Sequence, residues 1–243
     1  MTSIRLLSVY FRSFYLIRFI IVSIVFNLVF FLYFSESTVE NSTGEVFKYI
    51  YNGRFFEIDV LGGLIWTSHF VIIVFFTGAF IENNFYSQCA SILLRTSRML
   101  WYFTYFLFFF IVSFLYLLIQ ILAYIIYFSL ISQTLYLISI DRVIMQGICV
   151  LISMFTILSL FFLCYLLFKL KVSFIIVTII LFIYAFVVRE DYISLLPGGM
   201  GMLNSLNFNG MFKILVIQII YCCTFISFGF FKIQKMDILK NIE

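Results

Sequence analysis

The sequence has very few charged residues and almost no proline. Only 11% of its 243 residues are charged, 65% are hydrophobic, and proline occurs once. Soluble domains carry about a quarter charged residues. So few charges could not cover the core of a soluble protein of this length, whereas a bilayer accepts an apolar outer surface. The composition therefore excludes an ordinary soluble fold and predicts an all-α polytopic membrane protein.

Residues that bind metals are also scarce. The chain has five cysteines and one histidine, His69. No cysteine pair has the spacing of zinc ligands, and a lone histidine cannot complete a site, so no metal is predicted. We interpret the four cysteines in apolar runs as small buried residues: Cys149, Cys164, Cys222 and Cys223. No stretch is rich in Pro, Gly or Ser, so we expect residues 1–243 to form a single transmembrane domain.

Long apolar runs dominate the rest of the chain. A spanning helix needs about 20 mostly apolar residues. The first run is too long for the hydrophobic region of a signal peptide and is expected to remain as a helix. The uncharged stretch between Arg98 and Asp141 could hold two helices, but no Gly or Pro breaks it and we favour one. Six spans are predicted: residues 15–34, 60–81, 100–128, 143–168, 172–188 and 214–231.

The basic residues predict the orientation of these spans, because cytoplasmic loops are enriched in Lys and Arg. With the N- and C-termini in the cytoplasm, the inner side of a bacterial cell membrane carries twice as many basic residues as the outer side. The inner residues are Arg5, Arg12, Arg18, Arg95, Arg98, Lys169, Lys171, Lys232, Lys235 and Lys240, and the outer ones are Lys48, Arg54, Arg142, Arg189 and Lys213. Anionic lipid headgroups explain this charge without a nucleic-acid partner.

Three segments outside the spans carry a pattern of their own. Residues 1–14 mix apolar and basic residues, which favours an amphipathic helix in the membrane interface, although a simple flank of the first span is an alternative. Residues 82–99 form a cytoplasmic amphipathic segment. Residues 189–213 contain Pro197 and three nearby glycines, and they are too broken to cross. We expect an external re-entrant or interfacial segment there.

The spans hold almost none of the groups that chemistry or ion coupling would need. None of the eleven acidic residues falls inside a span, and the chain has no phosphate-binding Gly-x-x-x-x-Gly-Lys-Ser/Thr motif. We therefore expect no enzyme activity, no catalytic residue, and a power source on another chain. Polar residues at depth that could line a pathway are His69, Asn27, Gln120 and Gln218.

The order of these elements resembles the permease subunit of ATP-binding-cassette transporters of the type-2 exporter class. In that family an acidic residue ends the second span, and an amphipathic coupling helix and a Ser-Arg pair follow. Here Glu82, the segment 85–94 and Ser97-Arg98 match that order. The chain departs from the family where Ala90-Ser91 replaces the usual Gly-Thr and Thr96 replaces a frequent proline.

The resemblance implies a dimeric exporter subunit, formed with a second copy or a sibling permease and driven by a separate cytoplasmic ATPase that holds ATP and magnesium. The family's cargo suggests a hydrophobic or amphipathic substrate such as a peptide, a bacteriocin or a lipid-like drug. Two alternatives are a non-transporting scaffold or immunity protein and an unrecognised intramembrane enzyme using His69. The residues implied in ATPase coupling are Glu82, Phe85, Ile92, Leu93, Arg95 and Arg98.

Overall fold

The computed structural model describes residues 3–37, 60–87, 97–131, 140–186, 196–198 and 208–235. Within these ranges every regular element is an α-helix. Each of the six predicted segments coincides with one helix from α2 onward, and α1 covers the predicted amphipathic segment. The helices are α1 (Ser3–Ser13), α2 (Leu16–Ser37), α4 (Val60–Ser87), α6 (Arg98–Ile131), α7 (Ile140–Phe168), α8 (Leu170–Phe186) and α10 (Phe208–Lys235).

Several of these helices are long and apolar enough to cross a membrane. In the described part of the chain, three helices meet both criteria over residues 98–123, 147–168 and 215–235. A fourth span is possible if α1 and α2, which meet at a bend of 67°, count as one. The all-α, multi-span character predicted from composition is therefore confirmed, whereas the number six remains a prediction.

Two boundaries differ by six residues from the sequence-based prediction. Helix α10 begins at Phe208 rather than at residue 214, so residues 208–213, predicted to belong to the external segment 189–213, are the first turns of this helix. The other difference is at the end of α4. The second span is predicted to end at residue 81, but α4 continues as one helix through Glu82 to Ser87. Polar Asn83 and Asn84 do not end the helix, because the Asn84 side-chain amide donates to the carbonyl of Phe80 at 2.9 Å within it. The helical part of the predicted coupling segment that the structure describes is thus an extension of α4.

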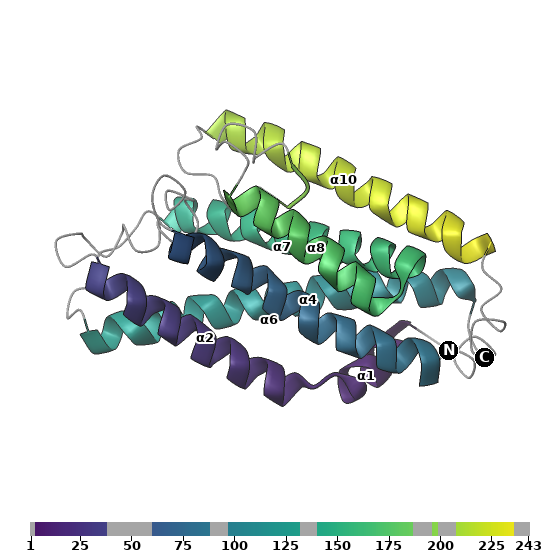
Figure 1. Cartoon of the computed structure of the whole chain (residues 1–243), viewed down its shortest axis with the longest axis horizontal. Helices are drawn as coiled ribbons and strands as arrows, with labels where there is room; N and C mark the ends of the chain where they lie inside the picture. Colours follow the sequence, from purple (N-terminus) through teal and green to yellow (C-terminus); the bar gives the residue numbers. More distant parts are fainter. Residues whose placement is uncertain are drawn as a thin grey trace.

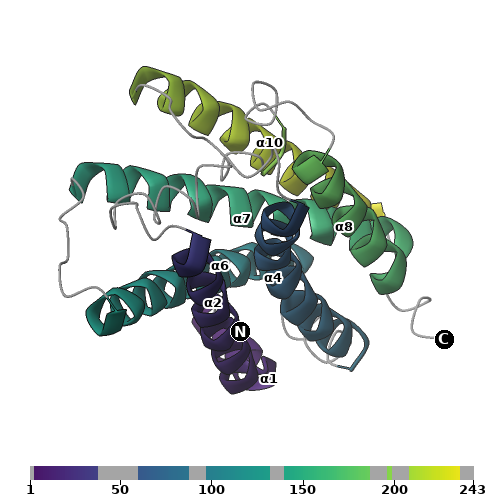
Figure 2. The same cartoon turned by 60° about the vertical axis from the view of Figure 1, so that its left-hand side comes forward.

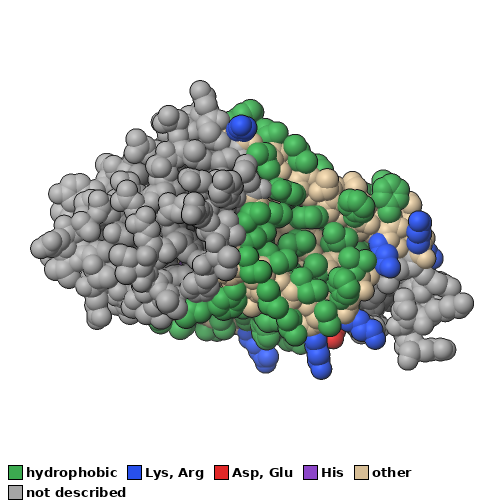
Figure 3. All heavy atoms as spheres, turned by 45° about the horizontal axis from the view of Figure 1, so that its top comes forward, with side chains coloured by type: hydrophobic (Ala, Val, Ile, Leu, Met, Phe, Trp, Pro, Cys, Tyr) green, Lys and Arg blue, Asp and Glu red, His purple; other side chains and the backbone are tan. Residues whose placement is uncertain are grey.

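The helices alternate in direction along the bundle (Figure 1). The start of α1, the end of α4, the start of α6, the α7–α8 junction and the end of α10 lie at one end, on the right of that view. We call this the basic end, and Figure 3 shows most of the visible Lys and Arg side chains at the right and along the lower edge of the hydrophobic surface. Its described basic residues are Arg5, Arg12, Arg18, Arg98, Lys169, Lys171, Lys232 and Lys235.

Helix α7 is the centre of the bundle. It packs against α4, α6, α8 and α10, and Figure 2 shows it between α6 and α10. Accordingly, 67% of its spanning window is buried, compared with 22% for α10. Helices α4 and α7 approach closely at Gly78, where an added Cβ would lie 2.9 Å from the Phe161 ring. Helix α10 is peripheral and is joined to α6 by the Tyr102 hydroxyl, which donates to the carbonyl of Ile226 at 2.7 Å.

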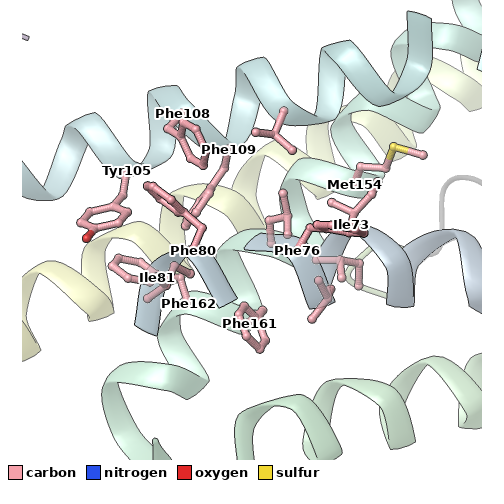
Figure 4. Packing of buried hydrophobic residues seen from close by; sticks show 14 of the residues in the cluster. Ile73, Phe76, Phe80, Ile81, Tyr105, Phe108, Phe109, Met154, Phe161 and Phe162 are labelled. Atoms are coloured by element: carbon pink, nitrogen blue, oxygen red, sulfur yellow. The ribbon is translucent and has the colours of Figure 1, made fainter. Parts of the chain in front are cut away.

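Aromatic side chains fill the core between α1, α4, α6 and α7 (Figure 4). The Phe80 and Phe108 ring centroids are 4.2 Å apart, and those of Tyr105 and Phe162 are 5.1 Å apart. Aromatic pairs in such arrangements contribute about 0.5–1.5 kcal/mol beyond the area they bury. Tyr10 of α1 packs on Phe80 and Tyr105, so this cluster fixes α1 to the bundle.

Candidate functional site

His69 forms the first of two buried polar sites. Its Nδ1 lies 2.8 Å from the Tyr116 hydroxyl and 3.1 Å from the Gln120 side-chain nitrogen, both on α6. The donor and acceptor roles in this network follow from the tautomer of the imidazole ring. Phe26 of α2 meets the imidazole edge-on with a centroid separation of 4.9 Å. His69 of α4 therefore joins its own helix to α2 and α6.

Asn27 forms a hydrogen bond within its own helix and not with the His69 network. Asn27 and His69 are both among the residues predicted to line a pathway. Asn27 is buried, and its side-chain amide donates to the carbonyl of Ser23 one turn earlier in α2, at 2.7 Å. Bonds of this kind satisfy a buried amide within its own helix. Of the four predicted pathway residues, only His69 and Gln120 are brought together.

Gln218 forms the second buried polar site, and its partners are backbone groups. Its Oε1 accepts a hydrogen bond from the Gly198 N–H at 2.7 Å, and its Nε2 donates to the Leu196 carbonyl at 2.7 Å. The amide of a fully buried α10 side chain thus brackets the turn Leu196–Gly198 from both sides. We call this turn and the Gln218 side chain the turn site.

The turn site lies far inside the helix ends. Gly198 faces Ile157 and the Ser153 carbonyl of α7. Ser153 is 13 residues beyond the start of α7 and Gln218 is 10 beyond the start of α10. At a rise of 1.5 Å per residue, these positions lie about 20 Å and about 15 Å along their helices. Within the windows long and apolar enough to span a membrane, Ser153 lies six residues after Gly147 and Gln218 lies three residues after Leu215.

Glycine is required at the tip of this turn. Gly198 has a φ of +78°, a region that other residues rarely adopt. A Cβ at this position would collide with the Ile157 side chain. One helical turn along, Thr156 of α7 and Cys222 of α10 are 3.0 Å apart, Oγ1 to Sγ, and close the same interhelical seam.

The predicted coupling residues lie partly within the described structure. Glu82 and Arg98 are exposed at the basic end, on the extension of α4 and at the first residue of α6. The Ser97 hydroxyl caps α6 by accepting from the Leu100 N–H at 3.2 Å. Phe85 lies in α4, and its side chain is not among those described. Ile92, Leu93 and Arg95 lie outside the described residues.

Sequence reasoning missed two tyrosines whose hydroxyl groups join helices. By sequence Tyr116 is one aromatic among many in the third span, yet it bonds to His69. Tyr15 is by sequence only the start of a span, yet its hydroxyl accepts from the Asn83 amide at 3.4 Å and ties the α1–α2 bend to the α4 extension. A spacing of four between Tyr116 and Gln120 places both on one helix face, which is the signal that could have found the first pair.

Comparison with known proteins identified no matching family model, no similar curated protein and no similar solved structure. Among the described residues, no group of three or more His, Cys, Asp or Glu side chains is arranged to hold a metal ion.

Proposed function

We propose that the chain is the permease subunit of a two-component ATP-driven exporter in a bacterial cell membrane, with six spans and cytoplasmic termini. A separate cytoplasmic ATPase would hold ATP and magnesium, and a second copy or a sibling permease would complete the pathway. The substrate class is a hydrophobic or amphipathic molecule such as a peptide, a bacteriocin or a lipid-like drug. The chain itself carries out no catalysis in this scheme.

The lack of buried charged side chains in the described helices supports a permease that is powered by a separate ATPase. Carriers coupled to protons or metal ions keep ionisable side chains at depth to bind the coupling ion. The buried polar side chains of the described helices include hydroxyls, amides and one imidazole, but no Asp, Glu, Lys or Arg. We infer that movement is driven at an end of the bundle rather than by an ion inside it.

The basic end offers a place where a separate ATPase would act on the helices. The position of the connection between α4 and α6 at this end is the observation that carries the proposal. Helix α4 extends past Glu82 to Ser87, and α6 starts at Arg98, so residues 88–97 connect two helix ends that both lie at the basic end (Figure 1). Glu82 and Arg98 are exposed there. A partner that moved this connection would act on two adjoining helices of the core at once.

The turn site supports a re-entrant segment between α8 and α10. Backbone groups within hydrocarbon must find protein partners, because each unsatisfied group costs several kcal/mol. Gln218 supplies partners for the N–H of Gly198 and the carbonyl of Leu196. A turn held in this way can lie at membrane depth near α7 and α10, where it would face a substrate passing along their seam.

Charge reversal at Arg98 tests the coupling role. The full chain would be reconstituted in vesicles with a cytoplasmic ATPase that co-purifies with it, and ATP-dependent movement of a labelled amphipathic peptide would be measured. We expect Arg98→Glu to insert and fold but to lose ATP-driven movement at least tenfold. An acidic residue at a helix start is favoured by the helix dipole, by about 0.3–1 kcal/mol, so the loss would not reflect an unfolded α6.

Lys213→Glu is the matched control, since Lys213 is an exposed basic residue on α10 at the opposite end of the bundle. It should leave ATP-driven movement within twofold of the original chain. Equal activity of Arg98→Glu and the original chain would contradict the coupling role. Substrate movement by the chain alone, without any ATPase, would contradict the permease proposal altogether.

A further inference from the structure

Helix α1 has two faces with different surroundings. Leu6, Tyr10 and Phe14 are spaced four residues apart and are buried, whereas Arg5 and Arg12 are exposed on the opposite side of the helix. The buried face is held by aromatic contacts, including the 4.9 Å separation between the Tyr10 and Tyr105 ring centroids. The most strongly apolar face of α1 is thus already occupied by α4 and α6.

Helix α2, which follows α1 at the bend, presents a surface suited to lipid. Ile17 of α2 is 74% exposed and Ile21 is 56% exposed, as expected for side chains that contact acyl chains. Between them Arg18 lies over the Tyr15 ring at 5.4 Å, at the bend between the two helices. Because α1 and α2 meet at 67°, α1 runs across the direction of the spanning helices rather than along it.

From this arrangement we propose that Arg5, Arg12 and Arg18 form a binding surface for anionic lipid headgroups. The occupant must be negatively charged, because the described part of the basic end holds eight basic residues and only Glu82 among acidic ones. A lipid fits better than a soluble protein, since Arg18 lies between exposed apolar side chains of α2. This inference goes beyond the proposed transport function and does not depend on it.

The structure also determines the physical character of this binding. An amphipathic helix that inserts its apolar face binds membranes through buried area. Here that face is packed on protein, so attraction to the lipid is mainly electrostatic. It should depend on anionic lipid and weaken as salt shortens the Debye length. Each basic residue near an anionic surface contributes about a fivefold gain in affinity.

Lipid-dependent stability of the full chain provides the test. Its melting midpoint would be measured in neutral detergent micelles with increasing phosphatidylglycerol, because a ligand that binds the folded state raises that midpoint. We expect a rise with phosphatidylglycerol, no comparable rise with phosphatidylcholine, and loss of the effect at high salt. Arg5→Gln/Arg12→Gln should need roughly 25-fold more phosphatidylglycerol for the half-maximal rise.

Three controls test whether the response arises from the arginines of α1 and α2. Lys232→Gln/Lys235→Gln removes two charges from α10 at the same end and should change the half-maximal concentration less than fivefold; an effect equal to that of the arginine pair would overturn the assignment to α1. Ile4→Ser removes an apolar side chain that is 79% exposed. If this variant lost the response to phosphatidylglycerol while Arg5→Gln/Arg12→Gln kept it, binding would be apolar rather than electrostatic. Inorganic phosphate should not reproduce the rise; if it did, a free anion rather than a lipid would be the ligand.

Discussion

The two buried polar sites are built from different kinds of group. At His69 the partners are side chains, with the Tyr116 hydroxyl and the Gln120 amide meeting one imidazole nitrogen. At Gln218 the partners are the backbone N–H of Gly198 and the backbone carbonyl of Leu196. The first site joins three long helices, and the second holds a three-residue turn against two helices.

This difference decides which side chains of each site can be replaced without leaving buried polar groups unsatisfied. A network of side chains can be replaced as a whole by apolar side chains, since no polar group then remains to be satisfied. Backbone groups cannot be removed by substitution, so a turn in an apolar interior keeps its need for partners. We infer that Gln218 is structurally indispensable for the turn, whereas the loss of His69 is partly offset when Tyr116 and Gln120 are replaced with it.

The largest expected effect is that of Gln218→Leu. The variant leaves two buried backbone groups unsatisfied, each at a cost of about 1–3 kcal/mol, so the free energy of unfolding should fall by about 4 kcal/mol. The measurement is titration of the purified chain with a denaturing detergent, followed by circular dichroism. Gln234→Leu, at an exposed position of the same helix, is the control and should change little. If Gln218→Leu were as stable as Gln234→Leu, the turn would not depend on this side chain.

A slightly smaller loss is expected for Gly198→Ala. A positive φ costs a residue with a side chain about 1–2 kcal/mol, and the collision with Ile157 adds an overpacking cost, for a total of about 3 kcal/mol. In a double-mutant cycle with Ile157→Ala, part of the loss should be recovered, giving a coupling energy of about 1 kcal/mol or more. Additive losses would mean that the turn does not press on Ile157.

The His69 site should show the smallest effect and a compensation that the turn site lacks. His69→Leu alone should cost about 1–2 kcal/mol, because Tyr116 and Gln120 lose a shared partner. The triple variant His69→Leu/Tyr116→Phe/Gln120→Leu should be at least as stable as His69→Leu in the same detergent titration. A triple variant that is much less stable than the single one would show that these side chains have other essential partners.

Local sequence patterns predicted most of the helical architecture. Runs of apolar residues located α2, α4, α6, α7, α8 and α10 to within six residues at every boundary, because apolar length is a property of the chain alone. The extension of α4 through Glu82 to Ser87 was missed, since charged and amide side chains are expected to end a span but do not prevent a helix. Gln218 was recognised as a polar residue at depth, but its role in holding a turn was not.

The sequence by itself determined that the chain is helical, apolar and basic at one end, because composition and the spacing of Lys and Arg do not depend on packing. Only the tertiary structure decided which polar groups meet. Gln218 and Gly198 are 20 residues apart, and His69 and Tyr116 are 47 apart. Contacts over such distances depend on how helices cross, and no local pattern in the chain encodes a crossing. For the same reason the sequence shows that α1 is amphipathic, but only its contacts with α4 and α6 decide that its aromatic face lies against the bundle and its arginines point outward.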